Sequence, residues 1–194
     1  MISTPKDLEA MTKAVKDRLD RPIVLVGMMG SGKSHAGTLL AQALGLDFAD
    51  SDKKIEEAAG CSVQEIFQRD GETKFRASEK RVVSELLGSG IMVLATGGGA
   101  IMDMDTAASI REKAVSIWID VDIDELLKRI KDKGGRPLLM GDNPKKVLEN
   151  LLKERRPAYE KADITVRGEG LAVAQLVDRM VDALHEFLCG DGRP

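Results

Sequence analysis

The feature that most constrains this chain is the segment at residues 27–34, which reads Gly-Met-Met-Gly-Ser-Gly-Lys-Ser and fits the pattern G-x-x-x-x-G-K-S. The apolar run Ile-Val-Leu-Val precedes it, and a segment with helical character follows at residues 38–44. A strand, a glycine-rich turn and a helix in this order direct backbone N–H groups and the positive end of the helix dipole at a polyphosphate. A simple glycine-rich turn would explain the glycines but not the Lys-Ser pair. We therefore predict a phosphate-binding loop.

The residue types of this loop predict the donor and its metal ion. Lys33 would reach the β- and γ-phosphates of a nucleotide, and Ser34 would bind magnesium, so ATP and Mg²⁺ are the expected cofactors. His35 follows directly in the sequence, but neither it nor His185 has a visible catalytic partner. The residues expected at the nucleotide on this basis are Gly30, Ser31, Gly32, Lys33, Ser34 and His35.

Five short apolar segments are typical of strands and lie at residues 23–26, 46–50, 91–96, 115–121 and 164–166. Helical segments separate them, and parallel neighbouring strands need crossovers of this length. We therefore predict an α/β fold with a five-stranded parallel sheet and helices on both faces. The chain has 194 residues with 43% apolar content, enough for one sizeable core, so residues 22–194 are expected to form a single domain. An amphipathic helix at residues 6–19 would belong to an amino-terminal extension, residues 1–21.

Caps and apolar spacing predict the remaining helices. Beyond the phosphate loop we expect helices at residues 53–60, 62–70 and 72–87, with Asp70-Gly71 breaking the chain between the last two. Further helices are expected at residues 122–130, 145–154 and 173–188. Residues 131–145 are rich in charge, glycine and proline, and a loop of this length suits an active-site lid.

Composition excludes several classes of partner. The net charge of −3, with one Trp and one Tyr, offers neither a broad basic surface nor stacking platforms for nucleic acid. No signal peptide is apparent, and no apolar run approaches the roughly 20 residues that span a bilayer. Cys61 and Cys189 lie far apart and are expected to be free thiols. We expect a cytoplasmic monomer without nucleic-acid or membrane partners.

Two carboxylates compete for the magnesium ion. Asp120 lies near the end of the fourth predicted strand, although it could equally belong to the start of the next helix, whereas Asp50 ends the second strand and opens the run Asp50-Ser51-Asp52. If this run is extended, Asp50 and Asp52 point to the same side. One of them would then serve the metal while the other meets the hydroxyl of an acceptor. The alternative is that Asp52 caps the following helix.

Glycines and arginines supply further candidates. Gly97, Gly98 and Gly99 directly follow the third strand, where ligands of open α/β sheets gather, although a flexible turn would look the same. Arg76 and Arg155 lie in distant segments that can converge above the sheet, and guanidinium groups suit a carboxylate. Arg129 and Arg136 flank or belong to the predicted lid and could neutralise a transferring phosphate. Each arginine could equally be a solvated surface charge.

The order and spacing of these motifs resemble the shikimate kinase family. Besides the phosphate loop, the resemblance rests on Asp-Ser-Asp at residues 50–52, Phe-Arg at 75–76 with Glu79, and Gly-Gly-Gly at 97–99. It continues through Arg-Pro-Leu-Leu at 136–139 and Arg-x-Pro-x-Tyr at 155–159, and covers about residues 22–166. Each motif alone is modest, but the ordered set is specific.

The resemblance implies that the protein transfers a phosphoryl group from ATP to the 3-hydroxyl of shikimate, a step in aromatic amino-acid biosynthesis. It implies Lys33, Asp52 and Arg136 as catalytic residues, with Ser34 and Asp50 at the metal. The substrate-binding residues implied are Asp52, Arg76, Gly97, Gly98, Gly99 and Arg155. Glu79 would orient Arg76. Arg129 and Arg136 would lie at the nucleotide, and the adenine-side loop would lie near residues 167–170.

Two alternatives stay open from the sequence. A related small-molecule kinase, such as one acting on gluconate, would share the phosphate loop and the lid. A nucleotide-binding regulator would bind ATP without acceptor-dependent turnover and would use the amino-terminal helix for a partner.

Overall fold

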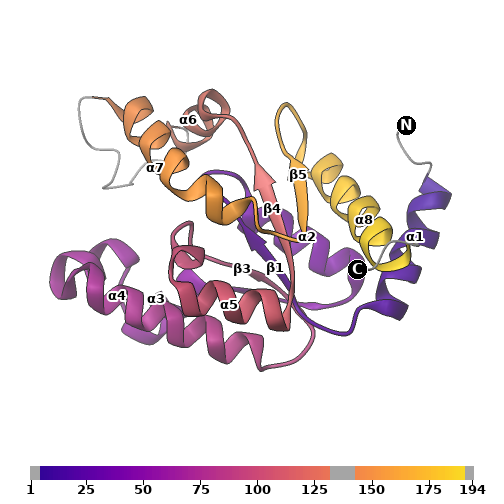
Figure 1. Cartoon of the computed structure of the whole chain (residues 1–194), viewed down its shortest axis with the longest axis horizontal. Helices are drawn as coiled ribbons and strands as arrows, with labels where there is room; N and C mark the ends of the chain where they lie inside the picture. Colours follow the sequence, from indigo (N-terminus) through magenta and orange to yellow (C-terminus); the bar gives the residue numbers. More distant parts are fainter. Residues whose placement is uncertain (1–4, 132–142, 191–194) are drawn as a thin grey trace.

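The sheet that organises the molecule is fully parallel, with strand order β2-β3-β1-β4-β5 (Figure 1). This computed structural model describes residues 5–131 and 143–190. Within them the strands are β1 Ile23–Val26, β2 Asp47–Asp50, β3 Met92–Ala95, β4 Val115–Asp120 and β5 Ile164–Arg167. The predicted five-stranded parallel sheet is therefore confirmed. β1 is central and fully buried, so the loop that follows it lies at the middle of the sheet's carboxyl edge.

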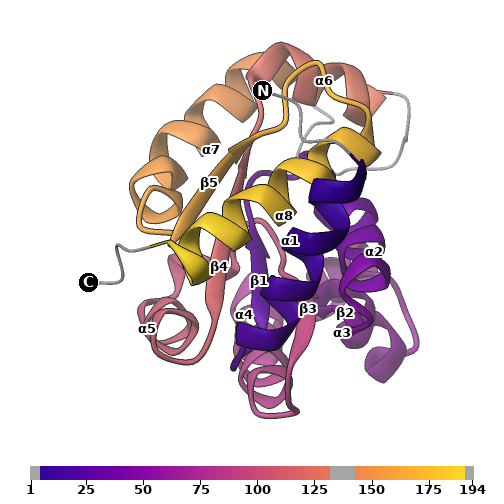
Figure 2. The same ribbon diagram turned by 90° about the vertical axis from the view of Figure 1, so that its right-hand side faces the viewer.

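Helices cover both faces of the sheet. α2 and α8 pack on one face, and α5 and α7 lie on the other (Figures 1 and 2). The helices in chain order are α1 Pro5–Arg18, α2 Lys33–Leu44, α3 Ser51–Ala59, α4 Val63–Leu87, the 3-10 turn η1 Ala100–Met102, α5 Met104–Lys113, α6 Ile123–Lys131, α7 Pro144–Tyr159 and α8 Val173–Cys189. The main core includes residues of all five strands together with α1, α2 and α8.

The chain differs from the sequence-based expectations in two places. No element was predicted between residues 100 and 114, yet η1 and α5 lie there, and the Asp103 carboxylate caps α5 by accepting from the Thr106 N–H at 2.8 Å. α7 continues through Pro157 to Tyr159 instead of ending near residue 154. The predicted break at Gly71 is present as a residue with φ 79° and ψ 167° inside α4.

The amino-terminal helix packs along α8 (Figure 2). Val15 is completely buried and Leu19, which follows the helix, is 7% exposed, so α1 contributes to the main core. Its last turn is basic, and Arg18 Nη1 donates to the Leu188 carbonyl at 3.4 Å, near the end of α8. This contact is favourable because the carboxyl end of a helix carries partial negative charge.

Two further observations concern the predicted lid and the membrane. Residues 132–142, which include Arg136 and most of the predicted lid, lie outside the described residues. Among the helices of the described residues, none is long and apolar enough to cross a membrane.

Candidate active site

The phosphate loop joins β1 to α2 and has the local geometry that its sequence predicts. Gly30 and Gly32 have φ angles of 80° and 98°, and Gly32 is the N-cap of α2. These left-handed conformations are open to glycine at little cost. No side chain caps the helix at Gly32, so the first N–H groups of α2 point toward the loop.

Lys33 and Ser34 begin α2 and point in different directions. Lys33 is 8% exposed, and its Nζ donates to the carbonyls of Gly27 at 2.8 Å and Met28 at 2.9 Å. The lysine therefore lies along the loop. Ser34 Oγ donates to Asp50 Oδ2 at 2.5 Å, which brings together the two residues expected at magnesium. A hydroxyl and a carboxylate are oxygen ligands of the kind that Mg²⁺ prefers, so this pair fits the ion.

Asp50 and Asp52 are not arranged as an extended segment, so that prediction is wrong. α3 already begins at Ser51, and Asp50 is its N-cap, with Oδ1 accepting from the N–H groups of Asp52 at 3.0 Å and Lys53 at 3.4 Å. The cap is thus Asp50 and not Asp52. The competing carboxylate, Asp120, forms an ion pair with Arg156 at 3.4 Å, and Asp50 is the one that contacts the phosphate-loop helix.

Asp52 is partly buried beside other carboxylates, so its charge is costly. Burial raises its pKa to about 6, and the neighbouring Asp50 and Glu79 carboxylates add to this, while Lys33 opposes it. Its Oδ1 is buried and has no hydrogen-bond partner among the described residues. A carboxylate with a pKa near neutrality can accept a proton from an alcohol and still be ionised at physiological pH.

Arg76 and Glu79 form a partly buried ion pair on α4. Glu79 is 2% exposed, and its Oε2 accepts from Arg76 Nη1 at 2.7 Å. Burial raises the pKa of Glu79, and Arg76 opposes the shift. Arg76 also bonds Glu72 through Nε and Nη2 at 3.3 and 3.2 Å. The guanidinium is thereby held by two carboxylates, one about a turn before Arg76 and one about a turn after it, with its direction fixed.

The glycine triplet is where the acceptor-side residues meet. A Cβ atom on Gly97 would lie 2.7 Å from Asp52 Oδ1 and closer still to Glu79 Oε1. One on Gly98 would lie 3.3 Å from Arg155 Nη1, and one on Gly99 would lie 2.7 Å from both terminal nitrogens of Arg76. None of the three has a positive φ. The triplet is therefore a site of close approach and not simply a flexible turn.

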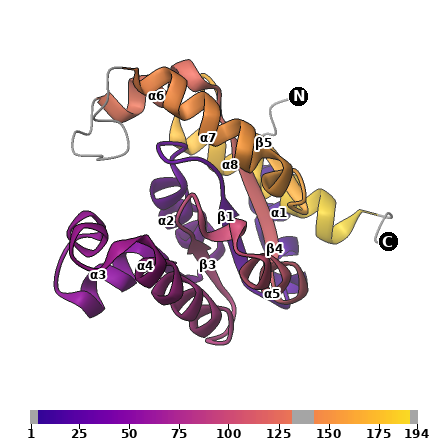
Figure 3. The same ribbon diagram turned by 60° about the vertical axis from the view of Figure 1, so that its left-hand side comes forward.

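These side chains reach the triplet from separate elements. Asp52 comes from α3, Arg76 from α4 and Arg155, which is 8% exposed, from α7. Figure 3 shows α3 and α4 on one side of the strands and α6 and α7 on the other. The sequence prediction that Arg76 and Arg155 converge is correct, and neither is a freely solvated surface charge.

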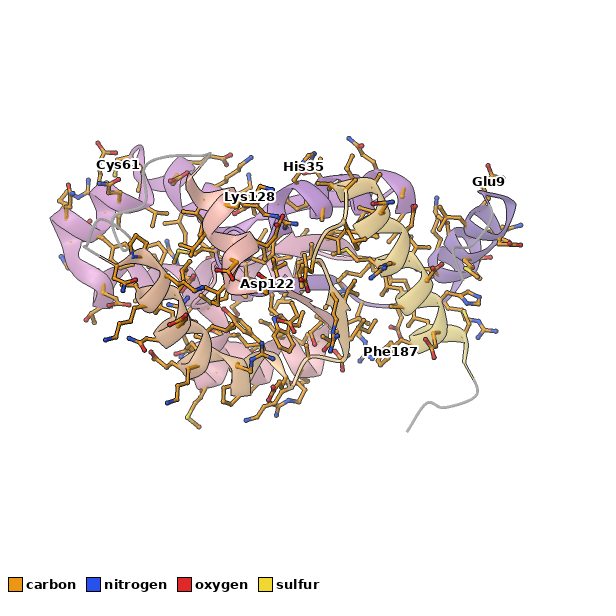
Figure 4. All side chains as sticks on the ribbon, turned by 90° about the horizontal axis from the view of Figure 1, so that it is seen from above. Glu9, His35, Cys61, Asp122, Lys128 and Phe187 are labelled. Atoms are coloured by element: carbon orange, nitrogen blue, oxygen red, sulfur yellow. The ribbon has the colours of Figure 1, made fainter. Side chains whose placement is uncertain are left out.

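Arg129 connects the phosphate loop to the loop after β5. Its Nη1 donates to the Ser31 carbonyl at 3.2 Å and its Nη2 to the Gly168 carbonyl at 3.1 Å, while Nε bonds Glu125 at 3.0 Å. Residues 167–170, where the adenine-side loop is expected, therefore lie beside the phosphate loop. His35, in contrast, is exposed on the outer side of α2 (Figure 4), so its contact with a nucleotide would come from its backbone N–H.

Two buried residues at the triplet were not assigned a role from the sequence. Ser51 Oγ accepts from the Gly97 N–H at 3.1 Å, and Tyr159 Oη donates to the Gly98 carbonyl at 2.5 Å. Tyr159 is the single tyrosine of the chain and closes the Arg-x-Pro-x-Tyr motif, a signal that could have drawn attention to it. For Ser51, the sequence gives no signal beyond its position between Asp50 and Asp52.

Within the described ranges, no group of three or more His, Cys, Asp or Glu side chains could hold a metal ion by itself. Cys61 and Cys189 are free, as expected. The metal fit of Ser34 and Asp50 therefore depends on further oxygen ligands, which the phosphates of a bound nucleotide supply in kinases of this kind.

Comparison with known proteins identifies what the chain is similar to. The family model for shikimate kinase matches residues 29–185. The shikimate kinase of Rhodopseudomonas palustris is 48% identical over 170 residues, 88% of this chain and 84% of that protein. The structure of shikimate kinase from Acinetobacter baumannii in complex with shikimate aligns with a TM-score of 0.82 at 36% identity, covering 88% of this chain and 95% of that one. A gluconokinase from Sinorhizobium meliloti aligns with a TM-score of 0.58 at 18% identity, covering 88% and 95%, and so shares the fold alone.

Proposed function

The chain belongs to the shikimate kinase family, and from this premise we propose which of its residues carry out the reaction. The enzyme transfers a phosphoryl group from ATP to the 3-hydroxyl of shikimate, a step in aromatic amino-acid biosynthesis. One observation carries the assignment of residues. A partly buried acid and two arginines from three separate helices meet at the glycine triplet, beside the phosphate loop.

On the donor side, the phosphate loop binds ATP through its backbone N–H groups, and Lys33 neutralises charge on the transferring group. Lys33 Nζ now bonds two loop carbonyls, so nucleotide binding would replace these contacts with phosphate oxygens. Ser34 and Asp50 would hold Mg²⁺, which supplies neutralisation of phosphate charge when bound. Arg129 would hold the phosphate loop and the adenine-side loop in a fixed relation, through its bonds to Ser31 and Gly168.

On the acceptor side, Asp52 takes the proton of the shikimate 3-hydroxyl. Its pKa of about 6 leaves it ionised at pH 7 to 8 and makes it a better base than an exposed aspartate. Lys33 favours the ionised form, so the same residue that contacts the phosphates helps keep the base charged.

Arg76 and Arg155 bind the shikimate carboxylate, because a planar guanidinium forms paired hydrogen bonds with a carboxylate. Arg76 is held in place by Glu79 and Glu72, which lowers the entropy lost when the substrate binds. The backbone of residues 97–99 lines the substrate, with no side chain between it and the ligand. In-line transfer needs positioning and charge neutralisation more than covalent participation of the protein.

Arg136 and the lid at residues 131–145 complete the proposal from the sequence. Arg136 would enter when the lid closes and contact the transferring phosphoryl group. An Arg136→Ala variant should then lower kcat more than it weakens shikimate binding. Equal losses in both quantities would remove Arg136 from this role.

A coupled assay for ADP release tests the function. We expect turnover with ATP and shikimate, none above background with gluconate, and none without an acceptor. Turnover with gluconate would favour the related sugar kinase. Tight ATP binding with no acceptor-dependent turnover would favour the regulator instead.

We also propose that residues 22–194 form one kinase domain acting as a monomer, to which residues 1–21 add a helix. The packing of Val15 and Leu19 into the core supports a stabilising role for this helix. A chain without residues 1–21 should melt at a lower temperature and keep its kcat. Sedimentation of the full chain would test the monomer.

A further inference from the structure

The backbone around the glycine triplet has an unusual set of partners. The ladder between β3 and β1 ends when the Thr96 N–H donates to the Leu25 carbonyl at 3.2 Å. Beyond it, the carbonyls of Gly97 and Gly99 accept from the N–H groups of Ala100 and Met102 in the turn η1, at 3.1 and 3.0 Å. The Gly97 N–H and the Gly98 carbonyl lie between the sheet and this turn, where neither element satisfies them.

Two side chains from opposite sides of the triplet form hydrogen bonds with these two backbone groups. Ser51, at the start of α3, accepts from the Gly97 N–H at 3.1 Å, and Tyr159, at the end of α7, donates to the Gly98 carbonyl at 2.5 Å. Both residues are completely buried. Within the part of the chain that the structure describes, the N–H groups of Gly98 and Gly99 find no acceptor. The segment is thus anchored by one donor and one acceptor, and its two other N–H groups can donate to a ligand.

Tyr159 is itself rigidly held. Its ring stacks on Trp118 of β4, with centroids 5.8 Å apart and an angle of 24° between the planes. Its hydroxyl also lies 3.8 Å from the sulfur of Met28 in the phosphate loop. Arg155 is four residues earlier on the same helix and therefore on the same face. One face of α7 thus presents Arg155 and Tyr159 together to Gly98.

We propose that Ser51 and Tyr159 are positioning residues for the acceptor. They fix the Thr96–Gly97 and Gly98–Gly99 peptide groups, so that the free N–H groups of Gly98 and Gly99 and the Arg155 guanidinium face shikimate in a set geometry. This inference rests on the proposed function, because it assumes that shikimate lies against the triplet. Neither Ser51 nor Tyr159 touches the reacting atoms in this arrangement.

A Tyr159→Phe variant tests the proposal, because it keeps the ring on Trp118 and removes only the hydroxyl. We expect the dissociation constant for shikimate to rise about three- to tenfold, the change associated with one hydrogen bond. The dissociation constant for ATP should stay within about twofold. Burial raises the pKa of Tyr159 to about 12, so the hydroxyl is a donor throughout the working range and the loss should be the same at pH 6.5 and pH 8.5.

Thr96→Val is the matched control. Thr96 is 3% exposed, and its hydroxyl donates to the Leu25 carbonyl at 3.1 Å, one residue before the triplet. Removing this hydroxyl costs a buried side-chain hydrogen bond without touching the triplet, so shikimate affinity should stay within about twofold of the parent. An equal loss in Thr96→Val and Tyr159→Phe, or equal losses for ATP and shikimate, would overturn the proposal.

Ser51→Ala provides the second arm and does not depend on how Tyr159→Phe folds. It should weaken shikimate binding by a similar factor and speed hydrogen exchange at the Gly97 amide. Because both side chains hold the same short segment, the double variant should lose less than the product of the single losses. Unchanged shikimate affinity in both single variants would refute the positioning role of Ser51 and Tyr159 while leaving the kinase assignment intact. Absence of shikimate binding by the parent enzyme would instead refute the proposed function, and this inference with it.

Discussion

The two glycine-rich loops of the site use glycine for different physical reasons. In the phosphate loop, Gly32 has a φ of 98°, yet a Cβ atom there would meet no atom nearer than 3.8 Å. In the triplet, Gly97 has no positive φ, but a Cβ would fall 2.7 Å from Asp52 Oδ1 and even closer to Glu79. Gly32 is needed for its backbone conformation, and Gly97 is needed for the space that it leaves.

This difference distinguishes a feature that neighbouring residues form by themselves from one that distant segments form by packing together. A left-handed turn at the start of a helix is a property of a few consecutive residues. The space at the triplet, in contrast, is set by side chains from α3, α4 and α7. The turn at Gly32 should therefore depend chiefly on its own segment, and the acceptor side on contacts between distant segments.

The largest effect should come from the donor side. Replacing Lys33 by Ala removes the charge that faces the phosphates, and we expect kcat/KM to fall about a thousandfold or more. Shikimate affinity measured without nucleotide should stay within about threefold, because the acceptor contacts lie at the triplet. Lys128→Ala, at an exposed lysine on α6 (Figure 4), is the control and should leave both quantities unchanged. A parallel loss of shikimate affinity in Lys33→Ala would show that the two loops do not act separately.

Asp52→Asn should have the second-largest effect on catalysis. The amide keeps the shape of the side chain but cannot take the proton, so kcat should fall about 10²- to 10³-fold with a smaller change in shikimate affinity. In the parent, log kcat/KM should decrease below about pH 6, where Asp52 becomes protonated. Rapid assays across pH 5 to 9 would measure both effects. A profile that is flat through pH 6 would remove Asp52 as the base.

The same substitution should stabilise the fold. Since the native pKa of Asp52 is about 6 and its ordinary value is 3.8, the unfolded chain releases this proton at a lower pH than the native protein does. Stability therefore falls as the pH rises through this window, and the full cost of the charge is present above pH 6. At pH 8 we expect Asp52→Asn to melt about 3–6 °C higher than the parent. The gain should vanish near pH 4, and calorimetry at the two pH values would show it.

Arg76→Ala sharpens the acceptor side of the comparison. Losing a charge-assisted pair to the carboxylate should weaken shikimate binding about 10- to 100-fold, measured by calorimetric titration with nucleotide present. ATP affinity should be unaffected. Arg69, which is 61% exposed on the same helix and pairs with Asp70, supplies the control variant Arg69→Ala, for which no change is expected. Shikimate affinity equal to the parent in Arg76→Ala would exclude Arg76 from the clamp.

The smallest effects test the two glycines directly. Gly32→Ala forces a left-handed alanine, which costs about 1–2 kcal/mol of stability, and should weaken ATP binding about tenfold. Gly97→Ala displaces the Asp52 and Glu79 carboxylates and should weaken shikimate binding about tenfold with ATP affinity retained. Both affinities are to be measured for both variants. If Gly97→Ala damages ATP binding as much as shikimate binding, space at the triplet is not its function.

Elements whose signals lie within a few residues were predictable from the sequence. β1, the phosphate loop and the capping box at Ser62 are cases where each local preference agrees with the final structure. The error at Asp50 and Asp52 had a physical cause. The first turn of α3 is set by hydrogen bonds from its N–H groups to Asp50, so the chain turns helical one residue after the strand ends. Side chains two residues apart point to the same side only in an extended strand, so that rule does not apply to Asp50 and Asp52.

Other features depended on packing. α7 continues past Arg155 because Tyr159, completely buried, holds its last turn against Trp118 and Gly98. Without that contact, Pro157 would be a reason to end the helix. The short helix α5 was missed although Asp103 is a suitable cap, since its few apolar positions give a weak periodic signal.

The sequence by itself predicted the donor and the fold class, and it supplied the proposal for the acceptor residues, because a strand, a turn and a helix dipole are made by neighbouring residues and the ordered motifs are specific. Only the tertiary structure decided how the acceptor side is built. It showed Asp50 as the cap that joins α3 to Ser34, and it showed Ser51 and Tyr159 holding the glycine triplet. Spacing along the chain does not encode these contacts, because they form between elements that meet only when the sheet and its helices have packed.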